Sequence, residues 1–270
     1  MASSASVAGL ATSIQIRGIS IGRIFERAWS VTRHNAAIVI PLSLLGAIAI
    51  VLLAYFLQGI DRSALVLTVA GHALPGSIAL TLAQLSFGWL IGVIMQGAML
   101  PLFSAPAHGT RANLVFGVPL VLRSLLPLVT LGVLTGIAVM IGTTLLIIPG
   151  IVVYVLWSVA PSALVDEHDG IFLALDRSHE LTQGARWKVF GLFAILEVVT
   201  AILGLGSILI AARWFAISLR LQESIGYAVL LVAVNTTTCL IWAAVQASLY
   251  VELRQWKDGS SVETLNEVFA

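Results

Sequence analysis

Charge is the scarcest property of this sequence. Of its 270 residues only 10% are Asp, Glu, Lys or Arg, whereas 59% are hydrophobic, and the mean hydropathy is +1.03. A soluble globular domain is about 25% charged, so this chain cannot cover a surface of its size with charge. The composition excludes an ordinary soluble enzyme, a disordered chain and a nucleic-acid-binding protein. It predicts an all-α, polytopic membrane protein.

Cysteine and leader signals are also scarce. Cys239 is the single cysteine, so no internal disulfide can form, and we interpret it as a small apolar side chain. The first residues lack a basic segment ahead of an apolar core, which argues against a cleaved signal peptide. We therefore expect residues 1–17 to be flexible and the first membrane span to act as its own insertion signal.

Catalytic motifs are missing as well. The sequence has no phosphate-binding P-loop, no G-x-S-x-G elbow and no H-E-x-x-H pair. The run Asp166-Glu167-His168-Asp169 has the chemistry of divalent-cation ligands. Four consecutive ligands rarely converge on one ion, so a solvated boundary with a helix cap is the simpler interpretation. We predict no catalytic residue, no metal site and no cofactor.

Long uncharged runs predict six membrane spans. A spanning helix needs about 20 apolar residues, and lipid requires every backbone polar group to be paired within the segment. The fourth span is the weakest, because Pro149-Gly150 leaves a short segment, and a re-entrant or strongly tilted segment is the alternative. The spans are expected at 36–58, 77–103, 126–148, 151–166, 187–212 and 224–250, with a tail over 251–270.

The basic residues predict the orientation. With this parse, eleven Lys and Arg residues fall on one side of the membrane and three on the other. Basic residues accumulate on the cytoplasmic side of membrane proteins. We therefore expect both termini in the cytoplasm, in agreement with the even number of spans.

A short internal repeat precedes two of the spans. Residues 25–32, with the sequence FERAWSVT, align with residues 175–182, with the sequence LDRSHELT. We expect amphipathic helices over 18–34 and about 169–183, the second with Asp169 as N-cap and Gly184 as its stop. A degenerate third copy near Val115-Phe116 would give three units, each an amphipathic helix followed by a helical hairpin.

These amphipathic helices have two interpretations. They are either elbows that orient the following spans or interfacial helices that bind lipid headgroups. Basic residues would pair with phosphates, and Trp suits the boundary between water and lipid. The candidate headgroup contacts are Arg23, Arg27, Arg177, Arg186, Trp29 and Trp187.

The segment from about 147 to 190 resembles a known family. It contains Ile147-Ile148-Pro149-Gly150, Trp157, Ala160-Pro161, Asp166-Glu167, Gly170, Ala174-Leu175, Arg177-Ser178, Leu181-Thr182, Gly184 and Arg186-Trp187-Lys188-Val189-Phe190. This pattern is similar to the membrane domain of glycerophosphoryl diester phosphodiesterases and to YciC-like bacterial inner-membrane proteins. The ending Leu249–Arg254 fits more loosely. The resemblance implies a bacterial inner-membrane protein, and it implies no hydrolase activity because the catalytic barrel of the fused enzymes has no counterpart here.

One ionisable residue interrupts the fifth span. Glu197 lies about ten residues into an apolar helix, where a carboxylate costs a few kcal/mol and is expected to be protonated, paired or turned to a polar cavity. It is either a proton, cation or substrate site or an interhelical hydrogen bond that holds the bundle together. The candidate intramembrane polar site comprises Glu197, Asn235, Gln246, Gln84 and Gln96.

Two small-residue motifs permit close helix contacts. Gly88-x-x-x-Gly92 and Gly132-x-x-x-Gly136 lie in the second and third spans. They serve either packing within one chain or the seam of a homodimer. Taken together, the sequence favours a non-enzymatic, accessory or lipid-associated membrane protein, whose partners are membrane lipids and a membrane protein or second copy, and not nucleic acid. A small-solute or lipid transporter built around Glu197 is the alternative.

Overall fold

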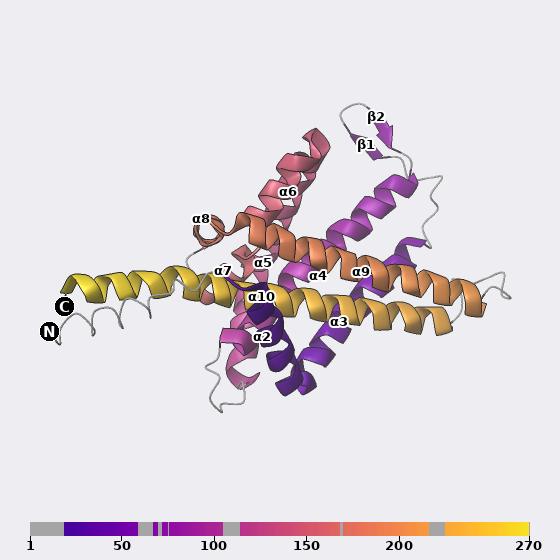
Figure 1. The fold of residues 1–270 in the computed structure, drawn as a ribbon. Helices are drawn as coiled ribbons and strands as arrows, with labels where there is room; N and C mark the ends of the chain where they lie inside the picture. The colour runs from indigo at the N-terminus through magenta and orange to yellow at the C-terminus, as the bar shows by residue number, and fades with distance from the viewer. Residues whose placement is uncertain are drawn as a thin grey trace.

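The fold is built from long apolar helices that cross one another. The computed structural model describes residues 19–58, 67–69, 72–74, 76–104, 114–167, 170–215 and 225–269. Their arrangement is shown in Figure 1. The helices are α2 (Ile21–His34), α3 (Ala36–Gln58), α4 (Gly76–Ser104), α5 (Leu114–Leu145), α6 (Ile147–Leu156), α7 (Ala160–Glu167), α8 (Ile171–Thr182), α9 (Arg186–Phe215) and α10 (Ile225–Phe269).

Six segments are long and apolar enough to cross a membrane. They are Ala36–Leu57, Leu80–Phe103, Arg123–Leu145, Ile147–Glu167, Arg186–Arg213 and Ile225–Asp258. The six predicted spans are therefore confirmed by length and composition. Local hydropathy suffices for this prediction because a spanning helix satisfies its own backbone hydrogen bonds.

A short strand pair joins the first two spans. Strands β1 (Leu67–Val69) and β2 (His72–Leu74) are antiparallel, and Thr68 lies opposite Ala73. The charge pattern of the sequence did not indicate these strands. They are too short to alter the helical class of the protein.

The boundary between the third and fourth spans differs from the prediction. The chain turns at Leu146, which has extended backbone angles, and Pro149 and Gly150 lie inside the first turns of α6. Proline is tolerated there because the first N–H groups of a helix have no partner within the helix. A Cβ atom on Gly150 would lie 2.9 Å from the Cα of Thr143. The glycine thus allows α6 to fold closely back along α5.

The fourth span is not one continuous helix. It consists of α6 and α7, separated by a break at residues 157–159. The side chain of Gln96 in α4, only 2% exposed, donates a hydrogen bond to the carbonyl of Ser158 (2.9 Å) and contacts the hydroxyl of Ser162 (3.2 Å). A backbone carbonyl released by a broken membrane helix needs such a partner. The predicted weakness of this span therefore corresponds to a real break, stabilised from a neighbouring helix.

Three further expectations are corrected by the helix bounds. Helix α8 begins after Gly170, which occupies the N-cap with φ +97°, so Asp169 is not the cap, and Asp169 itself lies outside the described residues. Residues 251–269 do not form a separate tail, because α10 continues through them. The suggested third copy near Val115 belongs to α5, which runs without a break into the third span.

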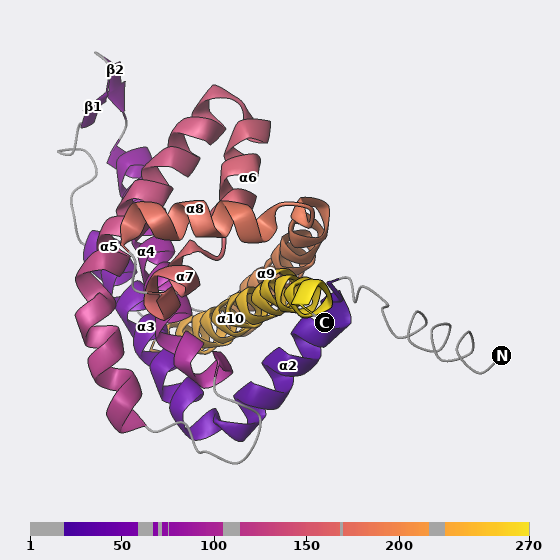
Figure 2. The ribbon, with the colours of Figure 1, turned by 90° about the vertical axis from the view of Figure 1, so that its left-hand side faces the viewer.

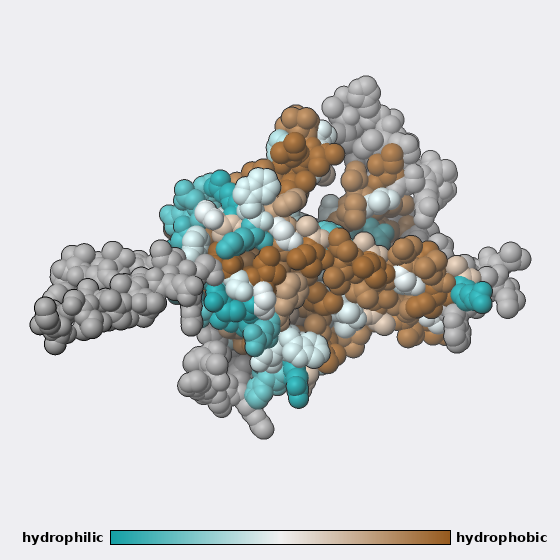
Figure 3. All heavy atoms as spheres, viewed as in Figure 1, coloured by the Kyte–Doolittle hydropathy of each residue, from teal (hydrophilic) through white to brown (hydrophobic). Residues whose placement is uncertain are grey.

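The buried core lies toward one end of the bundle. Its members that are at most 1% exposed come from eight helices, and include Ile24, Met99, Leu128, Leu181, Leu196 and Leu253. Elsewhere large apolar side chains are exposed, and Figure 3 shows them as a hydrophobic surface over α6, α9 and α10, bounded by a hydrophilic end. An exposed apolar surface of this extent is expected of a protein whose surroundings are lipid.

Candidate functional site

The last turns of α10 form the centre of a polar cluster. Its span, Ile225–Asp258, has 34 residues, more than the roughly 20 needed to cross the hydrocarbon. Figure 2 shows α10 passing between α2 on one side and α7 and α8 on the other. The contacts of α10 with all three helices agree with this view. The two amphipathic helices are thus joined through one long helix.

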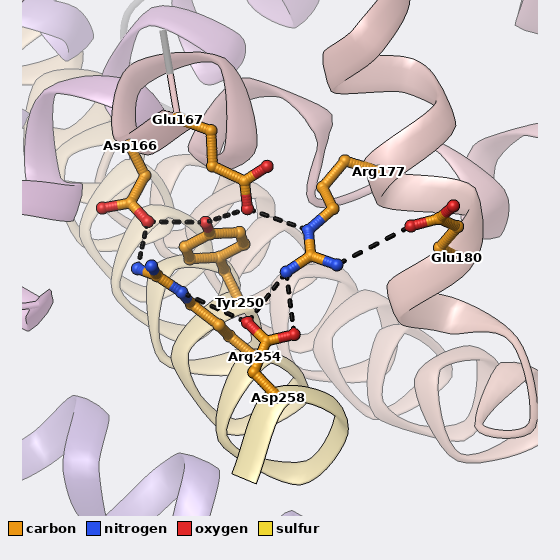
Figure 4. A network of polar contacts seen from close by, with 7 residues as sticks. All are labelled: Asp166, Glu167, Arg177, Glu180, Tyr250, Arg254 and Asp258. Atoms are coloured by element: carbon orange, nitrogen blue, oxygen red, sulfur yellow. Dashed lines mark hydrogen bonds and ion pairs between the residues drawn. The ribbon is translucent and has the colours of Figure 1, made fainter. Parts of the chain in front are cut away.

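One face of α10 binds the acidic end of α7. Tyr250 is fully buried, and its hydroxyl donates a hydrogen bond to Asp166 (2.8 Å). One turn further, the guanidinium of Arg254 pairs with the same carboxylate. Figure 4 shows both side chains converging on Asp166. The carboxylate thereby gains two donors, which offset the loss of water around it.

Arg177 of α8 completes this network. Its guanidinium donates to Glu167 (2.8 Å) and to Asp258 (2.8 and 2.9 Å), and it lies 3.7 Å from Glu180 (Figure 4). Burial alone would lower the pKa of Arg177, but the hydrogen bonds and charges of Glu167 and Asp258 outweigh it and raise that pKa above its ordinary value. Arg177 therefore remains a cation and connects α7, α8 and α10.

The opposite face of α10 binds α2. Glu252, 5% exposed, accepts hydrogen bonds from Arg23 (2.9 Å from Nε) and lies 3.9 Å from Arg27. Arg27 also donates to Gln255 (2.9 Å). Arg27 and Arg177 occupy equivalent positions of the sequence repeat, and each one pairs with α10. The repeat therefore has a structural counterpart in two helices held by the same partner.

A small cavity lies beside the network. Its volume is about 160 Å³. Its lining combines carboxylates and one guanidinium with apolar side chains, and comprises Ala163, Glu167, Leu173, Ala174, Asp176, Arg177 and Glu180. Within the described residues no group of three His, Cys, Asp or Glu side chains could hold a metal ion. Asp166 and Glu167 hold cations of the chain itself, and His168 and Asp169 lie outside the described residues.

The six candidate headgroup residues fall into two groups. Arg23, Arg27 and Arg177 pair with carboxylates of the same chain. Trp29 and Trp187 are 70% and 85% exposed, and Arg186 is exposed beside His179, 3.4 Å away. The second group is the more exposed of the two.

The predicted intramembrane polar residues are only partly brought together. Gln96 is committed to the break in the fourth span, and Asn235 donates to the carbonyl of Leu231 in its own helix (2.9 Å). Gln84 is exposed on α4. Gln246 shares a side-chain hydrogen bond with Tyr154, and Glu197 is exposed on α9.

The two glycine motifs differ in their surroundings. A Cβ atom on Gly132 would lie 2.9 Å from Leu90, whose neighbour Trp89 donates to the Gly132 carbonyl (3.1 Å). This motif therefore serves packing between α4 and α5 within one chain. Gly88 and Gly92 have open space around their Cβ positions among the described residues.

Several members of the network were not predicted. Tyr250, Glu252, Arg254 and Asp258 were interpreted as the end of a span and a tail, although Tyr250, Arg254 and Asp258 recur at intervals of four. Residues four apart share one helix face. That spacing was the available signal, and it indicates a polar face only if the helix is known to continue beyond the membrane.

The fold and its apolar surface define a multi-pass helical membrane protein. Comparison with known proteins agrees. The chain is 25% identical over 186 residues to a UPF0259 membrane protein of Pectobacterium carotovorum, an alignment covering 62% of this chain and 74% of that relative. It is 22% identical over 183 residues to a UPF0259 membrane protein of Yersinia pestis, covering 60% and 72% respectively. No family model and no solved structure matches the chain.

These relatives refine the resemblance seen in the sequence. They are bacterial membrane proteins, and their names state no activity. The bacterial multi-pass membrane character is therefore supported. The phosphodiesterase part of the resemblance stays a hypothesis.

Proposed function

We propose that this chain is a non-enzymatic accessory protein of the bacterial inner membrane that binds anionic lipid headgroups at the end carrying the polar network. One observation carries the proposal. Exposed aromatic and basic side chains gather where α2, α8 and α9 meet that end, represented by Trp29, Phe172, Arg186 and Trp187.

The physical basis is the preference of these side chains for the membrane boundary. Indole rings have an apolar body and a polar edge and collect at headgroup level. Basic residues close to an anionic surface each contribute about 1 kcal/mol of binding. Because Arg23, Arg27 and Arg177 already have carboxylate partners, headgroup binding is assigned mainly to Arg186 and the two Trp residues.

The basic residues support a cytoplasmic location for this end. By the span assignment from the sequence, eleven Lys and Arg residues are predicted on the side of the network and three on the other. Both termini are then cytoplasmic, and the proposed headgroups are those of the inner leaflet. The resemblance to phosphodiesterase membrane domains fits an accessory role, because the hydrolase part of those fused enzymes is a separate soluble barrel. The partner would be another membrane protein or a second copy of the chain.

Native mass spectrometry tests lipid binding. The protein is released from nanodiscs containing phosphatidylethanolamine and phosphatidylglycerol, and retained lipids are counted. We expect Arg186→Ala to lower the retained phosphatidylglycerol about fivefold, in line with about 1 kcal/mol per basic residue. Arg213→Ala, at the opposite end of the same helix, is the matched control and should change little. Equal retention by the wild type and Arg186→Ala would contradict the proposal.

A transport function around Glu197 is the second candidate. It is favoured by a carboxylate, Glu197, within the span of α9, and by the side-chain hydrogen bond between Gln246 of α10 and Tyr154 of α6. Transporters often place polar groups and broken helices near the middle of the membrane, and α6–α7 is such a broken span. Uptake into proteoliposomes that depends on Glu197 would support this candidate over the accessory role.

A further inference from the structure

Glu197 occupies an unusual position on the surface of α9. Eleven residues separate it from Arg186, or about 16 Å of helix at 1.5 Å per residue, which places it near the middle of the span. Its side chain is exposed, and its neighbours Val198 and Ile202 are 59% and 65% exposed. The carboxylate therefore lies on an apolar surface that faces lipid.

Within the described part of the chain, no hydrogen bond and no ion pair engages this carboxylate. Only its backbone carbonyl accepts a hydrogen bond, from Thr200 (3.1 Å). A charged group at the centre of a bilayer costs a few kcal/mol and is almost always paired or functional. A cation supplied from outside the chain would offset that cost.

A cluster of aromatic rings begins one helical turn from this position. Phe193, one helical turn before Glu197, stacks on Trp242 of α10 with ring centroids 5.9 Å apart. Tyr154 of α6 lies 5.0 Å from Phe193, and Trp89 of α4 lies 5.6 Å from Tyr154. Trp89, Tyr154 and Trp242 are each only half-buried. Phe193 itself is 3% exposed. Four helices thus contribute to one continuous aromatic cluster that begins one helical turn from the carboxylate.

The chemistry of these groups specifies the ligand. Aromatic faces attract cations, most strongly where water is absent, and they are the usual recognition surface for quaternary ammonium groups. A carboxylate supplies the opposite charge. Because the site opens to lipid, its ligand must itself dissolve in the membrane. We propose that Glu197 and the cluster of Trp89, Tyr154, Phe193 and Trp242 bind a lipophilic organic cation that enters from the bilayer.

This inference deepens the transport candidate only by naming a ligand class, and it is independent of the proposed lipid-associated role. Binding does not require transport. A chain that binds the cation without moving it across the membrane would retain the inference and exclude transport. Arg186→Ala should leave cation binding unchanged, so failure of the headgroup proposal can be recognised separately.

Binding of tetraphenylphosphonium to the full chain in nanodiscs tests the proposal. Affinity is measured by isothermal titration calorimetry, and quenching of tryptophan fluorescence reports contact with the aromatic cluster. We expect Glu197→Gln to weaken binding at least about tenfold through loss of the charge pair, and Trp242→Leu to weaken it about threefold through loss of a cation–π contact. Glu197→Asp, which keeps the charge, should bind more tightly than Glu197→Gln.

Thr200→Ala is the matched control. It lies one turn from Glu197 on the same helix and removes a hydroxyl but no charge, so its affinity should equal that of the wild type. Thermal unfolding of each variant checks that the fold is intact. Wild-type binding no greater than that of empty nanodiscs would overturn the proposal. Equal binding by the wild type and Glu197→Gln would also overturn the proposal. Glu197 would then have another role, such as contact with a helix of another membrane protein.

Discussion

At the scale of single residues, the most consequential group is the carboxylate of Glu252. Its side chain is 6% exposed and that of Arg23 is 40% exposed. The two partners of this ion pair therefore differ in how well water can solvate each one when the other is removed. Without Arg23 the buried carboxylate keeps only longer contacts, such as Arg27 at 3.9 Å, and pays much of its desolvation cost, whereas the half-exposed guanidinium is solvated by water.

This asymmetry predicts that Arg23→Ala destabilises the protein more than Glu252→Gln. We expect a loss of about 2 kcal/mol in the free energy of unfolding for Arg23→Ala and less than about 1 kcal/mol for Glu252→Gln. Unfolding in mild detergent, followed by tryptophan fluorescence, measures both. A larger loss of unfolding free energy for Glu252→Gln would contradict this prediction, because it would mean that the unpaired guanidinium is the more costly group.

Residue identity alone could not reveal these partners. The amphipathic pattern correctly placed Arg23, Arg27 and Arg177 on helices, but it left their partners open between lipid phosphate and protein. The structure places carboxylates of α7 and α10 against them. The sequence did not predict these partners because Glu252 and Asp258 follow an apolar run, and nothing in the local sequence indicates that their helix continues.

At the scale of elements, the hairpin of α5 and α6 depends on a close approach of two backbones. Gly150 lies against Thr143, where a Cβ atom would come within 2.9 Å of backbone. Backbone cannot move aside as a flexible side chain can. The turn at Leu146 can therefore form only if α6 presents a glycine at this point.

We accordingly expect Gly150→Val to destabilise the protein and Gly92→Val to be tolerated. Both glycines are helical, so the change in helix propensity is the same, but Gly92 has open space around it. The steric difference should be about 2 kcal/mol, a typical cost of overpacking. Thermal unfolding of the two variants measures it, and equal melting temperatures would refute the role of Gly150.

The break between α6 and α7 depends on a contact with another helix. The sequence predicted a weak fourth span but placed its disruption at Pro149-Gly150. Proline fits the start of a helix, and the true break at 157–159 is stabilised by Gln96, which lies more than 60 residues earlier. A local pattern cannot identify a hydrogen bond donated from another helix.

At the scale of the whole molecule, charge is distributed unequally between the two ends. The polar network, Trp29 and Trp187 lie at one end, and Arg213 lies at the other end of α9. We expect the network to be cytoplasmic because basic residues are retained on that side during insertion.

Cysteine labelling tests this orientation. In a Cys239→Ser background, Arg213→Cys should react with a membrane-impermeant maleimide added to intact spheroplasts. Lys257→Cys should react only after the cells are opened. The reverse pattern would invert the protein in the membrane and move the proposed headgroup site to the outer leaflet.

The sequence by itself determined the class of this protein, the number of spans and the place of the amphipathic helices. Hydropathy and helical periodicity are local properties, and a membrane helix satisfies the hydrogen bonds of its own backbone. Only the tertiary structure decided which polar groups meet. It engaged Gln96 with the backbone carbonyl of Ser158, assembled four aromatic rings into one cluster, and extended α10 to bind both α2 and α8. These contacts join residues far apart in the chain, so they depend on how the helices cross and not on any segment alone.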